Sequence, residues 1–360
     1  MLLLTAHTGW LLLLAQVLHP SPQAIPSTTH AQPTPQRAKS VDRARALVRA
    51  TLAQQNIPGL SVAVGIGRDL VWSEGFGWSD LESHTPVTPN TRFRIGTAST
   101  LLTAAAAGPL LDKGRLKLDD DIHTYVPQLP HQPSLLTLRQ LLANTNPTGP
   151  GAGSEEPLFR QRCEHPAEAL PHLGNGTPYR TSHHGWILVS AAIESASGQP
   201  FLPFLRESLF QSIKMSNTGA ETPATENPEH IGEESEDPPF LTFFRVKVLE
   251  PLGLAAARKP PASTDPATLY LPGPRPMRPR NLSCYAGALA FYSTPSDLVR
   301  FILARNPAAP SPPTYNGEFF GQRVASLATI RESGIAVAVL SNASSAGVPA
   351  LAHKIAEAFR

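Results

Sequence analysis

The chain has 360 residues, a formal net charge of +2, 41% hydrophobic residues and 16% charged residues. This composition is typical of a globular protein with a large core, and the near balance of charge gives no reason to expect a nucleic-acid partner. Proline is enriched, with 38 residues, which is about double the average usage.

The chain begins with a mainly apolar run that ends at Leu18. His7 and Gly9 interrupt the run, which is too short for a membrane span. We therefore interpret residues 1–19 as a signal peptide or signal-anchor, followed by a Pro-rich linker over 20–39. The sequence predicts a secreted or membrane-anchored protein that contacts a membrane only through this segment, with a mitochondrial location as the alternative.

The first predicted elements after the linker are a helix and a hairpin. Ser40 is an expected N-cap for a helix over 41–55, which places Ala44, Leu47, Val48 and Leu52 on one face. Strands are expected over 60–66 and 70–74, joined by a short turn. Their small and apolar residues indicate a sheet that is covered on at least one face.

The C-terminal end repeats this arrangement. Strands are expected over 324–330 and 335–340, followed by an amphipathic helix over 348–359. The middle of the chain is mostly helical or irregular. The pattern predicts a mixed α+β fold, with one antiparallel sheet built from both chain ends, flanking terminal helices and an inserted α-rich lobe. Within one domain over 40–360, the terminal lobe covers about 40–95 and 314–360, and the α-rich lobe covers about 96–313.

The chain contains two cysteines, Cys163 and Cys284. They allow either one disulfide or two free thiols. Neither cysteine has metal-ligand spacing, and we expect no metal site and no cofactor.

Five segments in the right order resemble the serine β-lactamase-like and penicillin-binding-protein family, which is related to class C β-lactamases. The resemblance runs from about residue 41 to 360 and implies a β-lactamase/transpeptidase-like fold. The matching segments are V-W-S-E-G-F-G at 71–77, K-G-R-L-K-L-D-D at 113–120, L-T-L-R-Q-L-L at 136–142, A-A-I-E-S-A-S-G at 191–198 and S-T-P-S-D-L-V-R-F at 293–301.

In this family a Ser-x-x-Lys motif opens a helix and supplies the nucleophile and its lysine. The flanks F-R-I-G at 93–96 and L-L-T-A at 101–104 resemble that region, but Thr97 and Thr100 stand at the two motif positions. The Thr97 hydroxyl can in principle attack a carbonyl, although its methyl group restricts χ1. Thr100 supplies neither a base nor a charge. The alternative is that Thr97 is an N-cap and Thr100 fills space.

The second and third family motifs also differ here. Tyr-x-Asn becomes Thr181-Ser182-His183, in which His183 is either a replacement base or an ordinary loop side chain. His/Lys-Thr-Gly becomes Tyr315-Asn316-Gly317, in which the glycine would let a substrate backbone approach the strand. The bulky residues that follow, E-F-F at 318–320, either narrow the groove or pack into the core.

Two departures concern the scaffold. Gly108-Pro109 is expected to interrupt the helix that Thr97 opens, because proline removes a backbone donor. The connection over 301–315 is short and leaves room for one strand fewer than in relatives.

Three hypotheses for function remain open. The first is a catalytically impaired family member that serves as a binding or assembly protein. The second is a divergent hydrolase of ester, amide or peptide bonds with Thr97 as nucleophile and His183 as base, acting on a peptide or small acyl substrate in a narrowed groove. The third is a truncated, marginally stable product.

Overall fold

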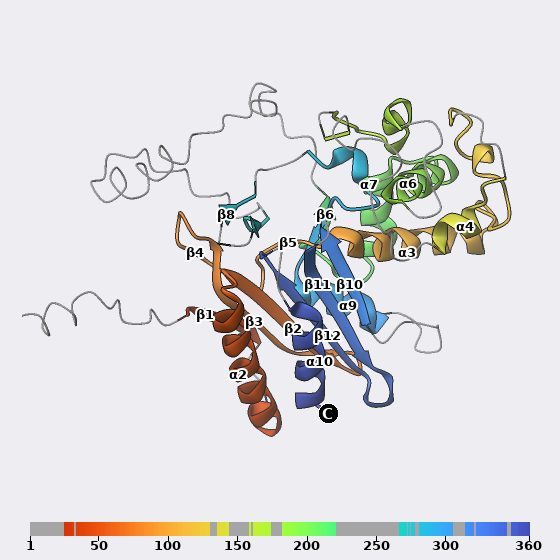
Figure 1. The fold of residues 1–360 in the computed structure, drawn as a ribbon. Coiled ribbons are helices and arrows are strands. Elements are labelled where there is room, and N and C mark those ends of the chain that lie inside the picture. Colours follow the sequence, from red (N-terminus) through yellow and green to blue (C-terminus); the bar gives the residue numbers. More distant parts are fainter. Residues whose placement is uncertain are drawn as a thin grey trace, which may run out of the picture.

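A computed structural model describes residues 25–31, 34–129, 135–143, 158–159, 161–173, 182–220, 266–271, 273, 275–277, 281–304, 314–319, 322–343 and 347–360. Strands from both ends of the chain lie side by side in one sheet, in the order β1-β3-β2-β12-β11-β10. Every pairing in this order is antiparallel. Figure 1 shows this sheet in one lobe and α3, α4, α6 and α7 in the other. The predicted α+β fold, with a sheet built from both termini, is confirmed.

The two predicted hairpins form the centre of the sheet. β2 and β12 are buried over almost their whole length, as expected for strands covered on both faces. They pair with each other, with Ile335 opposite Ile66 and Ser341 opposite Leu60. The strands are β1 (Ser27–Ala31), β2 (Gly59–Ile66), β3 (Asp69–Asp80), β4 (Thr85–Pro86), β5 (Phe93–Arg94), β6 (Gly219–Ala220), β7 (Tyr270–Leu271), β8 (Arg275–Pro276), β9 (Phe291–Ser293), β10 (Thr314–Phe319), β11 (Gln322–Ile330) and β12 (Ile335–Ser341).

The range 20–39, expected to be a linker, contains ordered elements. β1 pairs with β3 at the edge of the sheet, and a 3₁₀ turn over Pro35–Arg37 runs directly into α2. Ser40 therefore lies inside α2 and is not its N-cap. The α-helices are α2 (Ala38–Gln55), α3 (Ser99–Asp112), α4 (Leu138–Leu142), α6 (His183–Ser197), α7 (Phe201–Leu205), α9 (Pro295–Ala304) and α10 (Val348–Ala358).

Helices α2 and α10 cover one face of the sheet and pack against each other (Figure 1). Trp72 on β3 is fully buried beneath them and stacks on Phe359 with ring centroids 6.0 Å apart. Its indole N–H donates to the buried Glu74 carboxylate at 3.0 Å, which also accepts from Arg45 at 2.8 Å. These two donors satisfy a carboxylate that would be costly to bury alone.

Helix α9 covers the other face of the sheet and joins it to the helical lobe. Asp297 on α9 is fully buried and accepts from the Asn217 N–H and the Thr218 hydroxyl, at 2.8 and 3.0 Å, and from Arg300 at 2.7 Å. Burial raises the pKa of Asp297, and the hydrogen bonds from Asn217, Thr218 and Arg300 oppose that rise. The matching segment at 293–301 thus contains a buried residue that ties α9 to the segment at 217–218.

Helix α3 continues through Pro109 to Asp112, so the expected interruption is wrong. Pro109 lies in the last turn of the helix, and its carbonyl still accepts from the Lys113 N–H. A proline this close to the end removes little of the helical hydrogen bonding. Most of the short connection over 301–315 lies outside the described residues.

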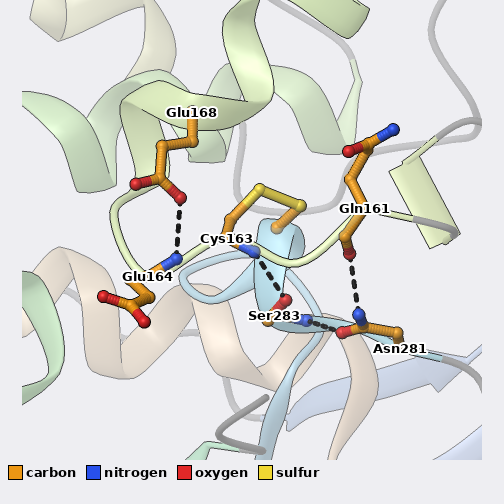
Figure 2. The surroundings of a disulfide bond; sticks show 7 residues. Gln161, Cys163, Glu164, Glu168, Asn281 and Ser283 are labelled. Atoms are coloured by element: carbon orange, nitrogen blue, oxygen red, sulfur yellow. Dashed lines mark hydrogen bonds between the residues drawn. A yellow bond between two sulfur atoms is a disulfide. The ribbon is translucent and has the colours of Figure 1, made fainter. Parts of the chain in front are cut away.

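Cys163 and Cys284 form a disulfide, which settles the alternative between one bridge and two thiols (Figure 2). Two polar contacts reinforce the same junction. The Cys163 N–H donates to the Ser283 hydroxyl at 3.0 Å, and the Asn281 side chain donates to the Gln161 carbonyl at 2.7 Å. The bridge closes a chain segment of 121 residues that contains much of the helical lobe.

No helix in the described ranges is both long and apolar enough to cross a bilayer. The described residues also contain no group of three or more His, Cys, Asp or Glu side chains placed to hold a metal ion.

The disulfide generates a stability prediction. We expect the double variant Cys163→Ser/Cys284→Ser to lose about 2–5 kcal/mol of unfolding free energy, because a long loop is no longer closed in the unfolded chain. Denaturant unfolding measures the loss. A reductant should lower the stability of the wild type and leave the variant unchanged; equal stability of the two proteins without reductant would contradict the expectation.

Candidate functional site

The predicted nucleophile lies in a 3₁₀ turn, η2 (Gly96–Ala98), directly before α3. Thr97 is only 2% exposed, and its hydroxyl oxygen accepts a hydrogen bond from the backbone N–H of Glu318 at 2.9 Å. Glu318 belongs to β10, 221 residues away in the sequence. The interpretation of Thr97 as an N-cap is therefore wrong, because its side chain binds a strand and not its own helix.

Thr100 is 1% exposed and lies one turn further along α3. Its hydroxyl donates to the Thr97 carbonyl at 2.8 Å and lies 2.7 Å from the Tyr315 phenol oxygen. Either oxygen can donate in this second contact. Burial raises the pKa of Tyr315, and the contact with Thr100 offsets only part of that rise, so the phenol stays neutral at physiological pH.

Two glycines bring β10 against the start of α3. A Cβ atom at Gly317 would lie 2.1 Å from the Ile95 carbonyl oxygen, and one at Gly96 would lie 2.1 Å from the Glu318 carbonyl oxygen. Gly96 also has a φ of +54°, which favours glycine. The space beside Gly317, expected to admit a substrate backbone, is filled by the chain's own backbone. Phe319 is 2% exposed and packs in the core, as one of the two alternatives proposed.

The second motif is described only in part. Thr181 lies outside the described residues, as does Phe320 in the third motif. His183 is the half-buried first residue of α6. Within the described part of the chain the Thr97 hydroxyl accepts from the Glu318 N–H, which belongs to β10 and not to α6.

Acyl transfer needs an accessible nucleophile, a base and donors for the developing oxyanion. The site brings together Thr97, Thr100, Tyr315 and Gly317. The hydroxyl groups of the two threonines and the tyrosine bind one another and the backbone. The Glu318 N–H is a donor of the kind an oxyanion requires, yet here it binds the nucleophile position itself. In this closed arrangement the contacts hold two elements together.

Sequence reasoning missed a second set of hydroxyl groups on α3. Ser99 donates to the Gly96 carbonyl at 2.7 Å and accepts from the Phe291 N–H at 3.3 Å, while Thr103 donates to the Gly287 carbonyl at 2.8 Å. A Cβ atom at Gly287 would lie 1.8 Å from the Ser190 hydroxyl oxygen on α6. The threonine-rich composition of α3 was the available signal, but the partners lie far away in the sequence.

A family model described as β-lactamase matches residues 44–326. The chain belongs to the β-lactamase family. The match includes the η2–α3 turn, His183, β10 and all five segments on which the resemblance rested, so the family assignment made from the sequence is confirmed.

Curated relatives cover limited parts of this family member. The bovine serine β-lactamase-like protein LACTB, mitochondrial, is 36% identical over 95 residues, which are 26% of this chain and 17% of that protein. The putative penicillin-binding protein PbpX of Bacillus subtilis is 25% identical over 194 residues, which are 52% of this chain and 48% of that protein. The chain thus matches less than half the length of either relative.

Solved structures with the same fold extend over more of the chain. FmtA from Staphylococcus aureus superposes with a TM-score of 0.65 and 17% identity, covering 97% of this chain and 95% of that one. A β-lactamase/D-alanine carboxypeptidase from Pseudomonas syringae gives a TM-score of 0.63 and 16% identity, covering 89% and 99%. At these identities the likeness shows the fold alone.

The close approach at Gly317 predicts that a side chain added at this position lowers the free energy of unfolding. We expect Gly317→Ala to destabilise the protein by about 1–3 kcal/mol, because the new methyl group would overlap the Ile95 carbonyl and neither backbone can yield easily. Gly108→Ala is the matched control, since its Cβ would meet no atom within 4 Å and alanine favours the helix interior. Thermal unfolding of both variants checks this. Equal effects would show that β10 is not held against η2.

The Thr97 hydroxyl predicts a second stability difference. Thr97→Val keeps the shape but removes the acceptor of the Glu318 N–H, so we expect a loss of about 1 kcal/mol in unfolding free energy. Thr97→Ser keeps the acceptor and should retain most of the stability. If valine were tolerated better than serine, the hydrogen bond would have no structural role. Denaturant titration distinguishes the two outcomes.

Proposed function

We propose that this β-lactamase family member keeps the scaffold of a serine hydrolase without its hydrolytic chemistry, and that it serves as a binding or assembly protein. The supporting observation is the contact between Thr100 and Tyr315. The position of the catalytic lysine holds a buried hydroxyl, and a phenol from β10 occupies the space beside it.

The size of the expected loss in kcat also supports this proposal. Removing a nucleophile or its base in a well-studied serine hydrolase costs about 10⁶ in kcat. Here the lysine is replaced, the second-motif asparagine position holds His183, and Thr97 at the nucleophile position is 2% exposed. A substrate carbonyl would reach Thr97 only if β10 moved away from η2.

A divergent hydrolase is the second candidate. The observation that favours it is the Glu318 N–H beside the Thr97 hydroxyl, which would serve as an oxyanion donor if β10 shifted and His183 acted as base. The third hypothesis, a marginally stable product, loses support because α3 accommodates Pro109 and two large buried clusters cover both faces of the sheet.

We also propose that the chain folds in an oxidising compartment. Disulfides persist in such compartments, and the buried Cys163–Cys284 bridge fits the export predicted from the N-terminal segment. The name of the bovine relative supports the mitochondrial alternative.

Hydrolysis assays test the proposed function. We expect the wild type and Thr97→Ala to give equal, background rates with a chromogenic cephalosporin and with p-nitrophenyl acetate, and neither to be labelled by a fluorophosphonate probe. Thr51→Ala, on α2, is the control for loss of a threonine hydroxyl elsewhere. A wild-type rate more than tenfold above that of Thr97→Ala would overturn the proposal. A matching loss in His183→Ala would favour the divergent hydrolase.

A further inference from the structure

The two helices on the outer face of the sheet carry an excess of positive charge. Helices α2 and α10, with the flanking Arg37 and Arg360, contain seven basic and two acidic side chains. We refer to these two helices and flanking residues as the basic layer. The whole chain has a net charge of only +2, so the rest of the chain is net negative. The positive charge of these helices therefore results from where the charged residues lie in the chain and not from the overall composition.

The exposed side of α2 has more basic than acidic side chains. Lys39, Arg43 and Arg49 are exposed, and at 100° per residue they fall within about 120° of the helix circumference. The same arc contains the exposed Asp42, which pairs with Arg45 at 3.3 Å, and the small exposed residues Ala46, Ala50 and Ala53. The opposite side of the helix is apolar and packs on the sheet.

These charges are not used to stabilise the fold. Arg45 on the same helix is half-buried and tied to Glu74 and Asp42. By contrast, Lys39, Arg43, Arg49 and the exposed Lys354 of α10 form no ion pair within the described part of the chain. Their charge is therefore available to a partner.

The first described strand, β1, leads into this layer. β1 lies at the sheet edge, and the chain passes from it through the 3₁₀ turn over Pro35–Arg37 into α2. Residues 19–26, between the end of the apolar run at Leu18 and β1, span at most about 30 Å. A bilayer that held the apolar segment would thus lie within reach of the basic layer.

We propose that the basic layer binds the surface of a membrane that contains anionic lipids. Lys39, Arg43 and Arg49 contact the phosphate and carboxylate groups of the lipids, and the small residues between them let α2 lie close to the headgroups. The apolar run favours a bilayer over other polyanions as the occupant of this surface. The proposal is independent of the proposed function, because the basic layer and the Thr97 site lie on opposite faces of the sheet.

Vesicle partitioning of the full chain tests the proposal. We compare neutral phosphatidylcholine vesicles with vesicles that contain about 30% phosphatidylserine, so that the neutral vesicles report binding by the apolar segment and the ratio isolates the charge effect. We expect Lys39→Gln/Arg43→Gln/Arg49→Gln to lower the ratio by roughly 100-fold, and salt to lower the wild-type ratio. Lys113→Gln/Arg115→Gln/Lys117→Gln, which removes three exposed charges from the other lobe, should leave the ratio unchanged.

Thermal unfolding of both triple variants shows whether they fold, and Arg43→Gln/Arg49→Gln replaces the first variant if it does not. Three results would overturn the proposal. They are a wild-type ratio near one, equal loss in the two triple variants, and tighter binding of a short DNA duplex than of anionic vesicles through the same three residues.

Discussion

The close approach of β10 to the η2 turn is the constraint on which the site depends. Two backbones meet where side chains are absent, at Gly96 and Gly317, and the Glu318 N–H reaches the Thr97 hydroxyl. This contact fixes the first turn of α3 to the edge of the sheet. The same approach leaves the Thr97 hydroxyl buried, so the feature that anchors the helix also removes access to the nucleophile position.

The residues at positions 100 and 315 form one unit across that contact. A lysine at 100 would place a charged amine against a buried phenol, and burying an unpaired charge is far more costly than burying a hydroxyl that is hydrogen-bonded. Thr100 instead satisfies the Tyr315 phenol and the Thr97 carbonyl. The two departures from the family motifs are therefore compatible with each other.

Much of the fold could be predicted from local patterns. The strands β2, β3, β11 and β12 and the helix α10 follow from their apolar residues and helical periodicity. The partner of Thr97 could not be predicted, because Glu318 lies 221 residues away and no local signal fixes such a contact. With two cysteines the sequence named the possible partner of Cys163, but it could not decide between a disulfide and two thiols. β1 was missed since prolines surround it, yet an edge strand needs hydrogen bonds on only one side.

The two faces of the sheet are covered by different parts of the chain. Thr97 and Thr100 lie on the face that packs against α9 and the helical lobe, whereas α2 and α10 cover the other face with their own apolar cluster. β2 and β12 are buried between the two and form a stiff layer. Substitutions in the nucleophile turn therefore leave the packing of α2 and α10 unaffected, and the basic side chains on those helices need no open active site. The proposed loss of chemistry on one face is physically compatible with the proposed binding surface on the other.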